Sequence, residues 1–541
     1  MGIIYGIDKL PKRNEKYELI QNDIVENTDV CIIGSGAAGA VLAKELVEVG
    51  KSVILLERGG YYEGKDMNQR ETDMMPLLWK NAGFNFDDKL RIAIAQGCCL
   101  GGSTIINDAV CFDPPIRIRN EWRLNGVNFT EEEWNTHLKK VNETLSVYEV
   151  TEDELNRNNR MLREGSKKIG MNEHRNNFRN CINCMQCGFC HLGCHYDTKQ
   201  NVLVTYIHQA LTNTNNSPHL KIYCNCYVDK IDYDNDEGNE LVKRVEGNFV
   251  DIDGNNKFKI KINAKITIIS AGAIASSEIL LKNKILPDIA GKGLCLHPGI
   301  EVIGDFDYEI KGNQGIPMAY TVHDFGNTRK SDDTMKQWNH DGREFLLESI
   351  FLPFLQLSIA LTASGPKLHR ELINRINNYA MAGVVVRDQN LGQIYYTNTG
   401  RLSVKYEPRL EELKAFTKGI EVLGKMWFAL GANKIIVPFK GMSIINREED
   451  IPKLIDRILQ EPKNLLMGSA HPQSGNKIGS NSQNSVVDSD CKVHNFKNLF
   501  VCDASVFPTA VGVNPQITVM AVASIISSRI INDWNTKYSN I

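Results

Sequence analysis

The chain has 541 residues, of which 42% are hydrophobic and 23% charged, a composition typical of a globular protein rather than a disordered one. Its length predicts more than one domain. The net charge of −3 gives no sign of a basic surface, so we expect no nucleic acid among its partners. The first twenty residues lack the apolar core of a signal peptide, and no apolar run reaches the roughly 18 residues that span a bilayer. We therefore expect a cytoplasmic protein whose 14 cysteines are reduced thiols or metal ligands rather than disulfides.

The first motif, at residues 29–57, has the pattern of a dinucleotide-binding unit. A short apolar run predicts a buried strand, helical spacing of apolar residues follows it, and a second strand ends at Glu57. Between the first strand and the helix, Gly34, Gly36 and Gly39 give G-x-G-x-x-G, which suits a tight turn, close approach to a pyrophosphate and helix packing. A carboxylate at the end of the second strand accepts hydrogen bonds from a ribose diol. The order of these parts predicts a site for NAD or FAD, which this motif alone does not distinguish.

Two later segments are rich in small residues. Residues 96–107 read QGCCLGGSTIIN, and such a loop lets the backbone lie against a flat ligand. Residues 270–281 read SAGAIASSEILL. Near the C-terminus, a strand over 499–502 ends in Asp503, and a helix is predicted to start near Pro515.

The region between these motifs predicts a different kind of structure. The sequence at 393–408 indicates two strands joined by a turn at 398–400. The apolar stretch at 344–361 predicts a buried helix. Its alternative interpretation is a lid or a membrane-docking surface.

Together, these motifs closely resemble those of the glucose–methanol–choline (GMC) flavin oxidoreductases. The chain carries the N-terminal fingerprint, a G-G-S-T-x-x-N loop, an A-G-A-I turn, H-P-x-x-G and D-A-S-x-x-P-T followed by N-P, in the order of that family. The resemblance extends over about residues 25–535. It implies an α/β fold with a Rossmann-like FAD-binding domain assembled from the discontinuous segments 25–115, 195–300 and 465–541. It also implies a cap or lid segment over 116–194 and a substrate-binding domain over 301–464, built on an antiparallel sheet with helices.

The resemblance also implies a set of site residues. FAD would contact Gly34, Ser35, Gly36, Gly39, Glu57, Arg58, Gly101, Gly102, Ser103, Asn107, Val228, Ala271, Asp503, Ala504 and Gln516. His471 and Asn514 match the catalytic pair of the family, and His297 is the next candidate for the base. An imidazole titrates near neutral pH and so can accept a hydroxyl proton, whereas a neutral amide can orient the alkoxide without competing for that proton.

Five cysteines, from Cys181 to Cys194, lie within fourteen positions. Cys184, Cys187, Cys190 and Cys194 have the C-x2-C-x2-C-x3-C spacing of a bacterial ferredoxin, which predicts an iron–sulfur cluster as one possibility. A second possibility is a structural zinc bound with His191 or His195. We favour a third possibility, in which buried thiols stabilise a loop and bind no metal. Three observations support this interpretation: no proline follows Cys194, Cys181 is surplus to a four-cysteine site, and relatives have a similar C-x-x-G-C loop.

The expected activity is FAD-dependent oxidation of the CH–OH group of an alcohol to an aldehyde or ketone. Hydride would pass to flavin N5 and the hydroxyl proton to His471. We expect a dehydrogenase that acts on a hydrophobic or mid-sized alcohol, with a lipid-like substrate and peripheral membrane contact as further options. The electron acceptor stays open. The alternatives are an alcohol oxidase that uses O2, a redox-silent flavoprotein lyase, an NAD-linked reductase, and a non-catalytic binding protein on the same scaffold.

Overall fold

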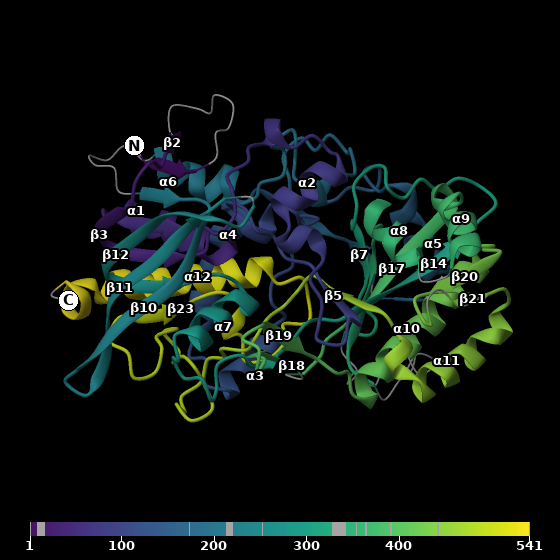
Figure 1. Ribbon diagram of the computed structural model, residues 1–541. Coiled ribbons are helices and arrows are strands. Elements are labelled where there is room, and N and C mark those ends of the chain that lie inside the picture. The colour runs from purple at the N-terminus through teal and green to yellow at the C-terminus, as the bar shows by residue number, and fades with distance from the viewer. Residues whose placement is uncertain are drawn as a thin grey trace.

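The computed structural model describes residues 2–7, 17–172, 174–212, 220–251, 253–326, 342–352, 354–362, 365–389, 392–440 and 443–539, with the side chains of 359–362 left out. Two large sheets lie at opposite ends of the molecule, and helices cover both (Figure 1). Each sheet has its own hydrophobic core. The segments that join the sheets cross the middle of the molecule several times.

The first sheet is mainly parallel and contains the predicted dinucleotide unit. Its strand order is β10-β11-β12-β3-β4-β9-β1-β2, and β23 pairs with β12. The strands are β10 (Cys226–Asp236), β11 (Asn239–Val250), β12 (Asn256–Ile269), β3 (Ile24–Ile33), β4 (Val53–Leu56), β9 (Leu220–Tyr223), β1 (Ile3–Gly6), β2 (Tyr17–Leu19) and β23 (Leu499–Val501). From β12 to β2 all neighbours run parallel, whereas β10, β11 and β12 form antiparallel pairs.

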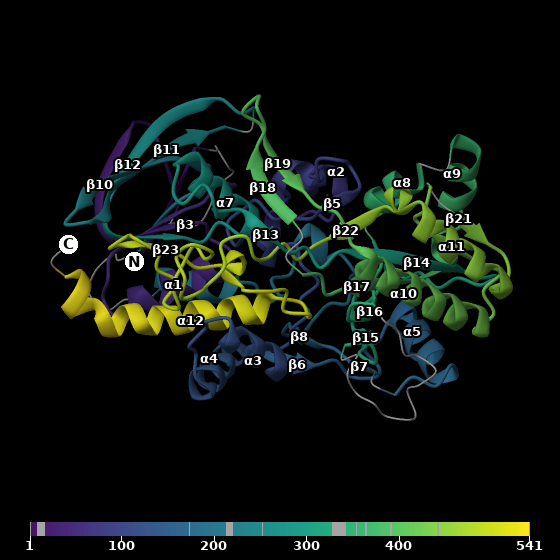
Figure 2. The ribbon, with the colours of Figure 1, turned by 90° about the horizontal axis from the view of Figure 1, so that it is seen from below.

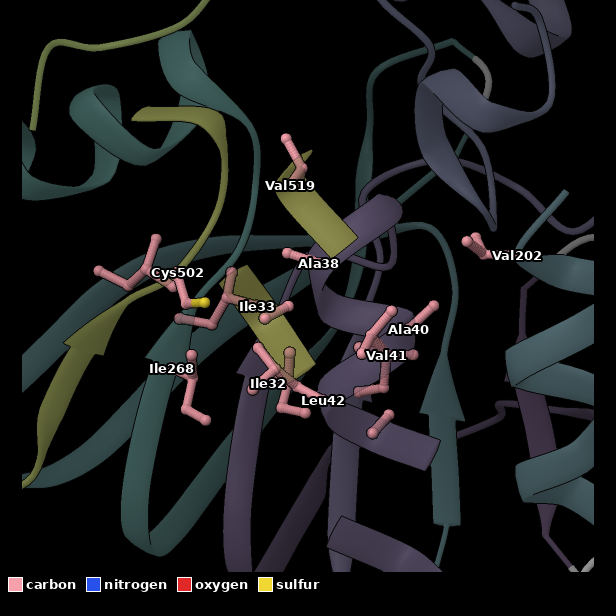
Figure 3. Packing of buried hydrophobic residues seen from close by; sticks show 14 of the residues in the cluster. Ile32, Ile33, Ala38, Ala40, Val41, Leu42, Val202, Ile268, Cys502 and Val519 are labelled. Atoms are coloured by element: carbon pink, nitrogen blue, oxygen red, sulfur yellow. The ribbon is translucent and has the colours of Figure 1, made fainter. Parts of the chain in front are cut away.

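Helix α1 (Ala37–Glu48) connects β3 to β4 as the sequence predicts. It packs against α12 (Gln516–Asp533), which in turn packs against α4 (Glu131–Thr144) (Figure 2). Apolar side chains fill the space beneath the sheet, among them Ile32 of β3 and Ile268 of β12 (Figure 3). This core fixes the ends of the parallel strands, where the first and last motifs of the sequence meet.

The second sheet is mainly antiparallel, in the order β21-β20-β14-β17-β16-β15-β7. These strands are β21 (Ser443–Ile445), β20 (Lys434–Val437), β14 (Gly299–Asp305), β17 (Tyr379–Val386), β16 (Phe345–Ser349), β15 (Tyr320–Val322) and β7 (His174–Asn176). Strand β22 (Met467–Ser469) pairs with β14 and, in parallel, with β5 (Ile92–Ile94). Helices α10 (Leu410–Ala429) and α5 (Arg157–Lys168) cover one face, and the other face is turned towards the first sheet.

The remaining elements are short. They are α2 (Glu71–Leu78), α3 (Ile116–Leu124), α6 (His208–Thr212), α7 (Ala273–Lys282), α8 (Phe354–Thr362), α9 (Pro366–Ile373), α11 (Ile451–Gln460), β6 (Val147–Glu149), β8 (Phe178–Asn180), β13 (Lys292–Leu294), β18 (Gly392–Tyr396) and β19 (Leu402–Lys405). The pair β18–β19 is the hairpin predicted at 393–408. Among the described helices, none is both long enough and apolar enough to cross a membrane.

The α/β fold predicted from the sequence is confirmed, but the buried helix predicted at 344–361 is wrong in its first half. Phe345–Ser349 is strand β16, paired on both sides, and only α8 is helical, with Phe354 at its start 56% exposed. Pro353 lies outside the described residues. A short apolar run does not distinguish a central strand from a buried helix, which explains the error.

The domain boundaries stay a prediction. Strands β1 and β2 lie before residue 25 and join the first sheet, and β7, within 116–194, joins the second.

Candidate active site

A cavity of about 720 Å³ lies between the two sheets. On one side it is lined by the residues that follow β3, β4, β12 and β23, at the carboxyl ends of these parallel strands. Open α/β sheets bind ligands at such an edge. On the other side it is lined by alternate residues of the second sheet. These are Gly299, Glu301 and Ile303 of β14, Glu348 of β16, and Met381 and Val385 of β17.

The glycines of the first motif have three different surroundings. Gly34 has a φ of +104°, and a Cβ there would lie 2.4 Å from the oxygen of Ser270. A Cβ on Gly39 would lie 1.9 Å from the oxygen of Gly34, so this glycine permits contact between helix and turn. Gly36 has no atom within 4 Å of that position and lines the cavity. The open space in front of Gly36, at the N-terminus of α1, fits a pyrophosphate.

Glu57 ends β4 and is 6% exposed. One carboxylate oxygen accepts hydrogen bonds from N and Oγ of Ser35, at 3.1 and 2.5 Å, and the other accepts from Gly59 N at 2.8 Å. Burial raises the pKa of this carboxyl, and these hydrogen bonds oppose the rise. Ser35 Oγ also accepts from Gly101 N at 2.9 Å, which ties the two glycine loops together. The carboxylate is thus placed for a ribose diol.

The remaining predicted FAD residues fall into two groups. Those that line the cavity, besides Gly34, Gly36 and Glu57, are Ser35, Arg58, Gly102, Ser103, Asn107, Val228, Ala271, Asp503, Ala504 and Gln516. Gly39 and Gly101 shape the loops without lining the cavity. Asn107 Nδ2 donates to Gln516 Oε1 at 2.9 Å, and Asp503 accepts from Gly272 N at 2.9 Å, so both C-terminal polar residues, Asp503 and Gln516, are held by earlier loops of the chain. This arrangement fits a bound flavin dinucleotide.

His471 and Asn514 meet at the centre of the cavity. His471 Nε2 lies 3.3 Å from Asn514 Nδ2, and both side chains line the cavity. The desolvation of His471 lowers its pKa to about 4, so the imidazole is neutral near pH 7 and able to accept a proton. His297 packs edge-on against His471, with ring centroids 5.5 Å apart, and its Nε2 accepts from Gly512 N at 3.0 Å. That nitrogen is therefore already occupied.

Sequence reasoning did not identify Asp108, Glu301 and Glu348, three polar residues of the cavity wall, and it considered His191 only as a possible zinc ligand. Asp108 Oδ1 lies 3.3 Å from His191 Nδ1. Burial raises the pKa of Glu301 and of Glu348 to about 7. Each glutamate is a charged residue within a mostly apolar strand, GIEVIGD or FLLES, and that interruption is the signal that could have revealed them.

The cysteine-rich segment reaches the cavity through His191 and not through its thiols. Arg179, fully buried, donates from Nη2 to Cys190 Sγ at 3.6 Å. Lys199 Nζ donates to the oxygen of Cys190 at 2.9 Å. Across the described residues, which include all five cysteines of this segment, no three His, Cys, Asp or Glu side chains are grouped as metal ligands.

Known proteins share this architecture. The GMC oxidoreductase models match residues 28–299 for the N-terminal part and 391–523 for the C-terminal part. Two long-chain-alcohol oxidases of Arabidopsis thaliana are 24% and 26% identical over 96% and 95% of this chain, and 71% and 69% of their own. The structure of pyridoxine 4-oxidase from Mesorbium loti matches with a TM-score of 0.67 at 15% identity, over 94% of this chain and 99% of the other. With the N-terminal model alone spanning half of the sequence, the chain belongs to the GMC oxidoreductases, a family of FAD-binding enzymes.

Proposed function

We propose that this enzyme oxidises an alcohol to an aldehyde or ketone, with His471 as the base that takes the hydroxyl proton. The observation that carries the proposal is the pair His471–Asn514, held 3.3 Å apart in a cavity that the flavin-binding loops share with the second sheet. A neutral imidazole and a neighbouring amide donor suit the removal of one proton from a hydroxyl. Bound FAD supplies the acceptor for the hydride.

The residues of the first sheet hold the cofactor in this proposal. Gly34, Gly36 and the N-terminus of α1 bind the pyrophosphate, and Glu57 binds the ribose. Gly102, Ser103 and Asn107 would hold the pyrophosphate and the isoalloxazine. Asp503, Ala504 and Gln516 would hold the ribityl chain and the pyrimidine edge. The FAD-binding domain then comprises 25–115, 195–300 and 465–541, with a cap over 116–194 and a substrate domain over 301–464.

A hydrophobic alcohol, lipid-like ones included, fits the wall of the cavity best. Phe351, Leu352 and Leu357, at α8 and the turn before it, line the cavity together with Phe84 and Phe86. Phe84 is 56% and Leu90 70% exposed, so the apolar lining continues onto the surface. Such a rim supports peripheral contact with a lipid surface. The long-chain-alcohol oxidases named above also act on apolar alcohols.

The electron acceptor is a separate question. A dehydrogenase reaction is our first proposal. An oxidase that uses O2 is the second, and its support is that the relatives named above are called oxidases.

We propose that Cys184, Cys187, Cys190 and Cys194 serve as thiols and not as cluster ligands, since Cys190 lies against Arg179 and Cys194 Sγ accepts from Lys199 N at 3.5 Å. An iron–sulfur cluster, supported by the cysteine spacing alone, would instead direct electrons to a protein or quinone.

A panel of alcohols, added anaerobically to the FAD-loaded protein, tests the activity. The flavin absorbance near 450 nm should bleach with apolar alcohols, and steady-state rates with an artificial acceptor and with O2 should then identify the acceptor class. A protein that holds FAD but bleaches with none of the alcohols would exclude the proposed oxidation. The lyase would then be the better interpretation.

A further inference from the structure

The loop at 509–513, which leads into Asn514, is held in place by side chains. In the described part of the chain, no main-chain to main-chain hydrogen bond involves this loop. Instead, Val511 N donates to Gln473 Oε1 at 2.9 Å, and both residues are fully buried. The position of the loop, and of Asn514 at its end, therefore depends on the side chains that other segments provide.

Two further side chains hold the neighbouring residues of the loop. Arg387 Nε donates to Ala510 O at 2.9 Å, and Gly512 N donates to His297 Nε2 at 3.0 Å. Among the described residues, neither of these two side chains forms a hydrogen bond with His471. The ring of His297 packs edge-on against that of His471, and such a contact fixes a distance less strictly than a hydrogen bond does.

Gln473 differs from these two anchors because it bonds both of the segments that must meet. Its Nε2 donates to His471 O at 3.2 Å, while its Oε1 accepts from the loop. Its own main chain is fixed, since Gln473 N donates to Cys295 O and Cys295 N donates to Gln473 O, both at 2.8 Å. One buried amide thus connects the segment of His471 with the loop of Asn514, where His471 Nε2 lies 3.3 Å from Asn514 Nδ2.

We propose that Gln473 is a positioning residue for the oxidation, because its amide sets the separation between His471 and Asn514. The inference rests on the proposed function. A base and an amide that act on one hydroxyl must stay at a fixed distance, and a displacement of about 1 Å can cost about 10²-fold in rate. A primary amide suits this role, since it provides an acceptor for one segment and a donor for the other on a single planar group.

The rate of anaerobic flavin reduction at saturating alcohol, measured on FAD-loaded protein, tests the proposal. Gln473→Met is of similar size but makes neither hydrogen bond. It should be slower by about 10- to 100-fold, with the dissociation constant of FAD changed by less than about threefold. Gln473→Glu still accepts from Val511 N but lacks the amide donor for His471 O. Its rate should therefore lie between those of Gln473→Met and the wild type.

Ser474→Ala is the matched control. Ser474 is buried beside Gln473, and its Oγ donates to Phe507 O at 2.8 Å. The variant loses one buried hydrogen bond to the same C-terminal segment, without a hydrogen bond to the loop or to His471, so its rate should stay within about threefold of the wild type. Equal slowing in Gln473→Met and Ser474→Ala would overturn the proposal, as would a wild-type rate in Gln473→Met. If Gln473→Met does not fold, a wild-type rate in Gln473→Glu would overturn it.

Hydrogen–deuterium exchange separates this inference from the proposed activity, because it needs no turnover. In the described part of the chain, Gln473 is the only acceptor for Val511 N. The peptide that contains 509–513 should therefore gain about one rapidly exchanging deuterium in Gln473→Met, and none in Gln473→Glu or Ser474→Ala. Unchanged exchange in Gln473→Met would overturn the proposal whether or not any alcohol reduces the flavin. Faster exchange in a protein that no alcohol bleaches would instead count against the proposed function and not against the link between the two segments.

Discussion

Lys199 and Asn107 are joined by a buried hydrogen bond in which Lys199 Nζ donates to the main-chain oxygen of Asn107 at 2.8 Å. The same ammonium donates to Ile105 O at 2.7 Å and to Cys190 O at 2.9 Å. One side chain, 1% exposed, therefore fastens the cysteine-rich segment to the loop proposed to carry the flavin.

Lys199→Met should loosen both segments, since three buried carbonyls lose their donor at once and each costs about 1–3 kcal/mol when left unpaired. The temperature at which flavin fluorescence appears, a measure of FAD release, should fall by roughly 5 °C or more. Lys139→Met is the control, because the side chain of Lys139 is 77% exposed. An unchanged release temperature in Lys199→Met would contradict the coupling of the two segments.

Removal of the Glu57 carboxylate should weaken FAD binding. Glu57→Ala takes away the proposed acceptor for the ribose diol and also the partner of Ser35 N and Gly59 N. The dissociation constant should rise by about 10- to 100-fold, as expected for lost charge-assisted hydrogen bonds. FAD content after exhaustive dialysis measures it. Glu237→Ala serves as the control, since the Glu237 side chain is 88% exposed, and equal FAD retention in the two variants would refute the assignment.

His471→Ala should slow flavin reduction by about 10²- to 10⁴-fold while FAD stays bound, as expected for loss of a general base. Asn514→Ala should cost less, because it orients the hydroxyl and takes no proton. In the wild type, the rate should fall as the pH drops through about 4. The imidazole gains a proton there and can no longer act as a base.

His297→Ala distinguishes the two histidines. Its Nε2 already accepts from Gly512 N, so we expect a smaller loss of rate than for His471→Ala. A larger loss in His297→Ala, with near-wild-type rates in His471→Ala, would transfer the role of base to His297.

The parallel half of the fold could be predicted from the sequence because its signals are local. The strand, glycine turn, helix, strand and acid at 29–57 are contiguous, and β3, α1 and β4 follow them closely. The meeting of His471 with Asn514 was inferred from the family pattern and not from the residues themselves. The place of Glu348 in the cavity wall could not be predicted in either way. It comes from the register of β16 on β17, a pairing over about 35 positions that no local pattern specifies.

The thiols of the cysteine-rich segment should differ in their reactivities. A hydrogen bond from Cys181 and the nearby Arg179 lower the pKa of Cys184 to about 6, against the effect of burial, whereas burial raises the pKa of Cys190 to about 11. The thiolate is the nucleophile, so iodoacetamide at pH 7 should modify Cys184 well before Cys190. Peptide mass mapping of briefly treated FAD-loaded protein measures the order, with Cys184→Ser as the control for assignment.

If the cysteines serve as free thiols, anaerobically purified protein should contain little iron. About four irons per chain, lost in Cys187→Ser together with protection of Cys184 and Cys190 from alkylation, would show that the segment binds a cluster.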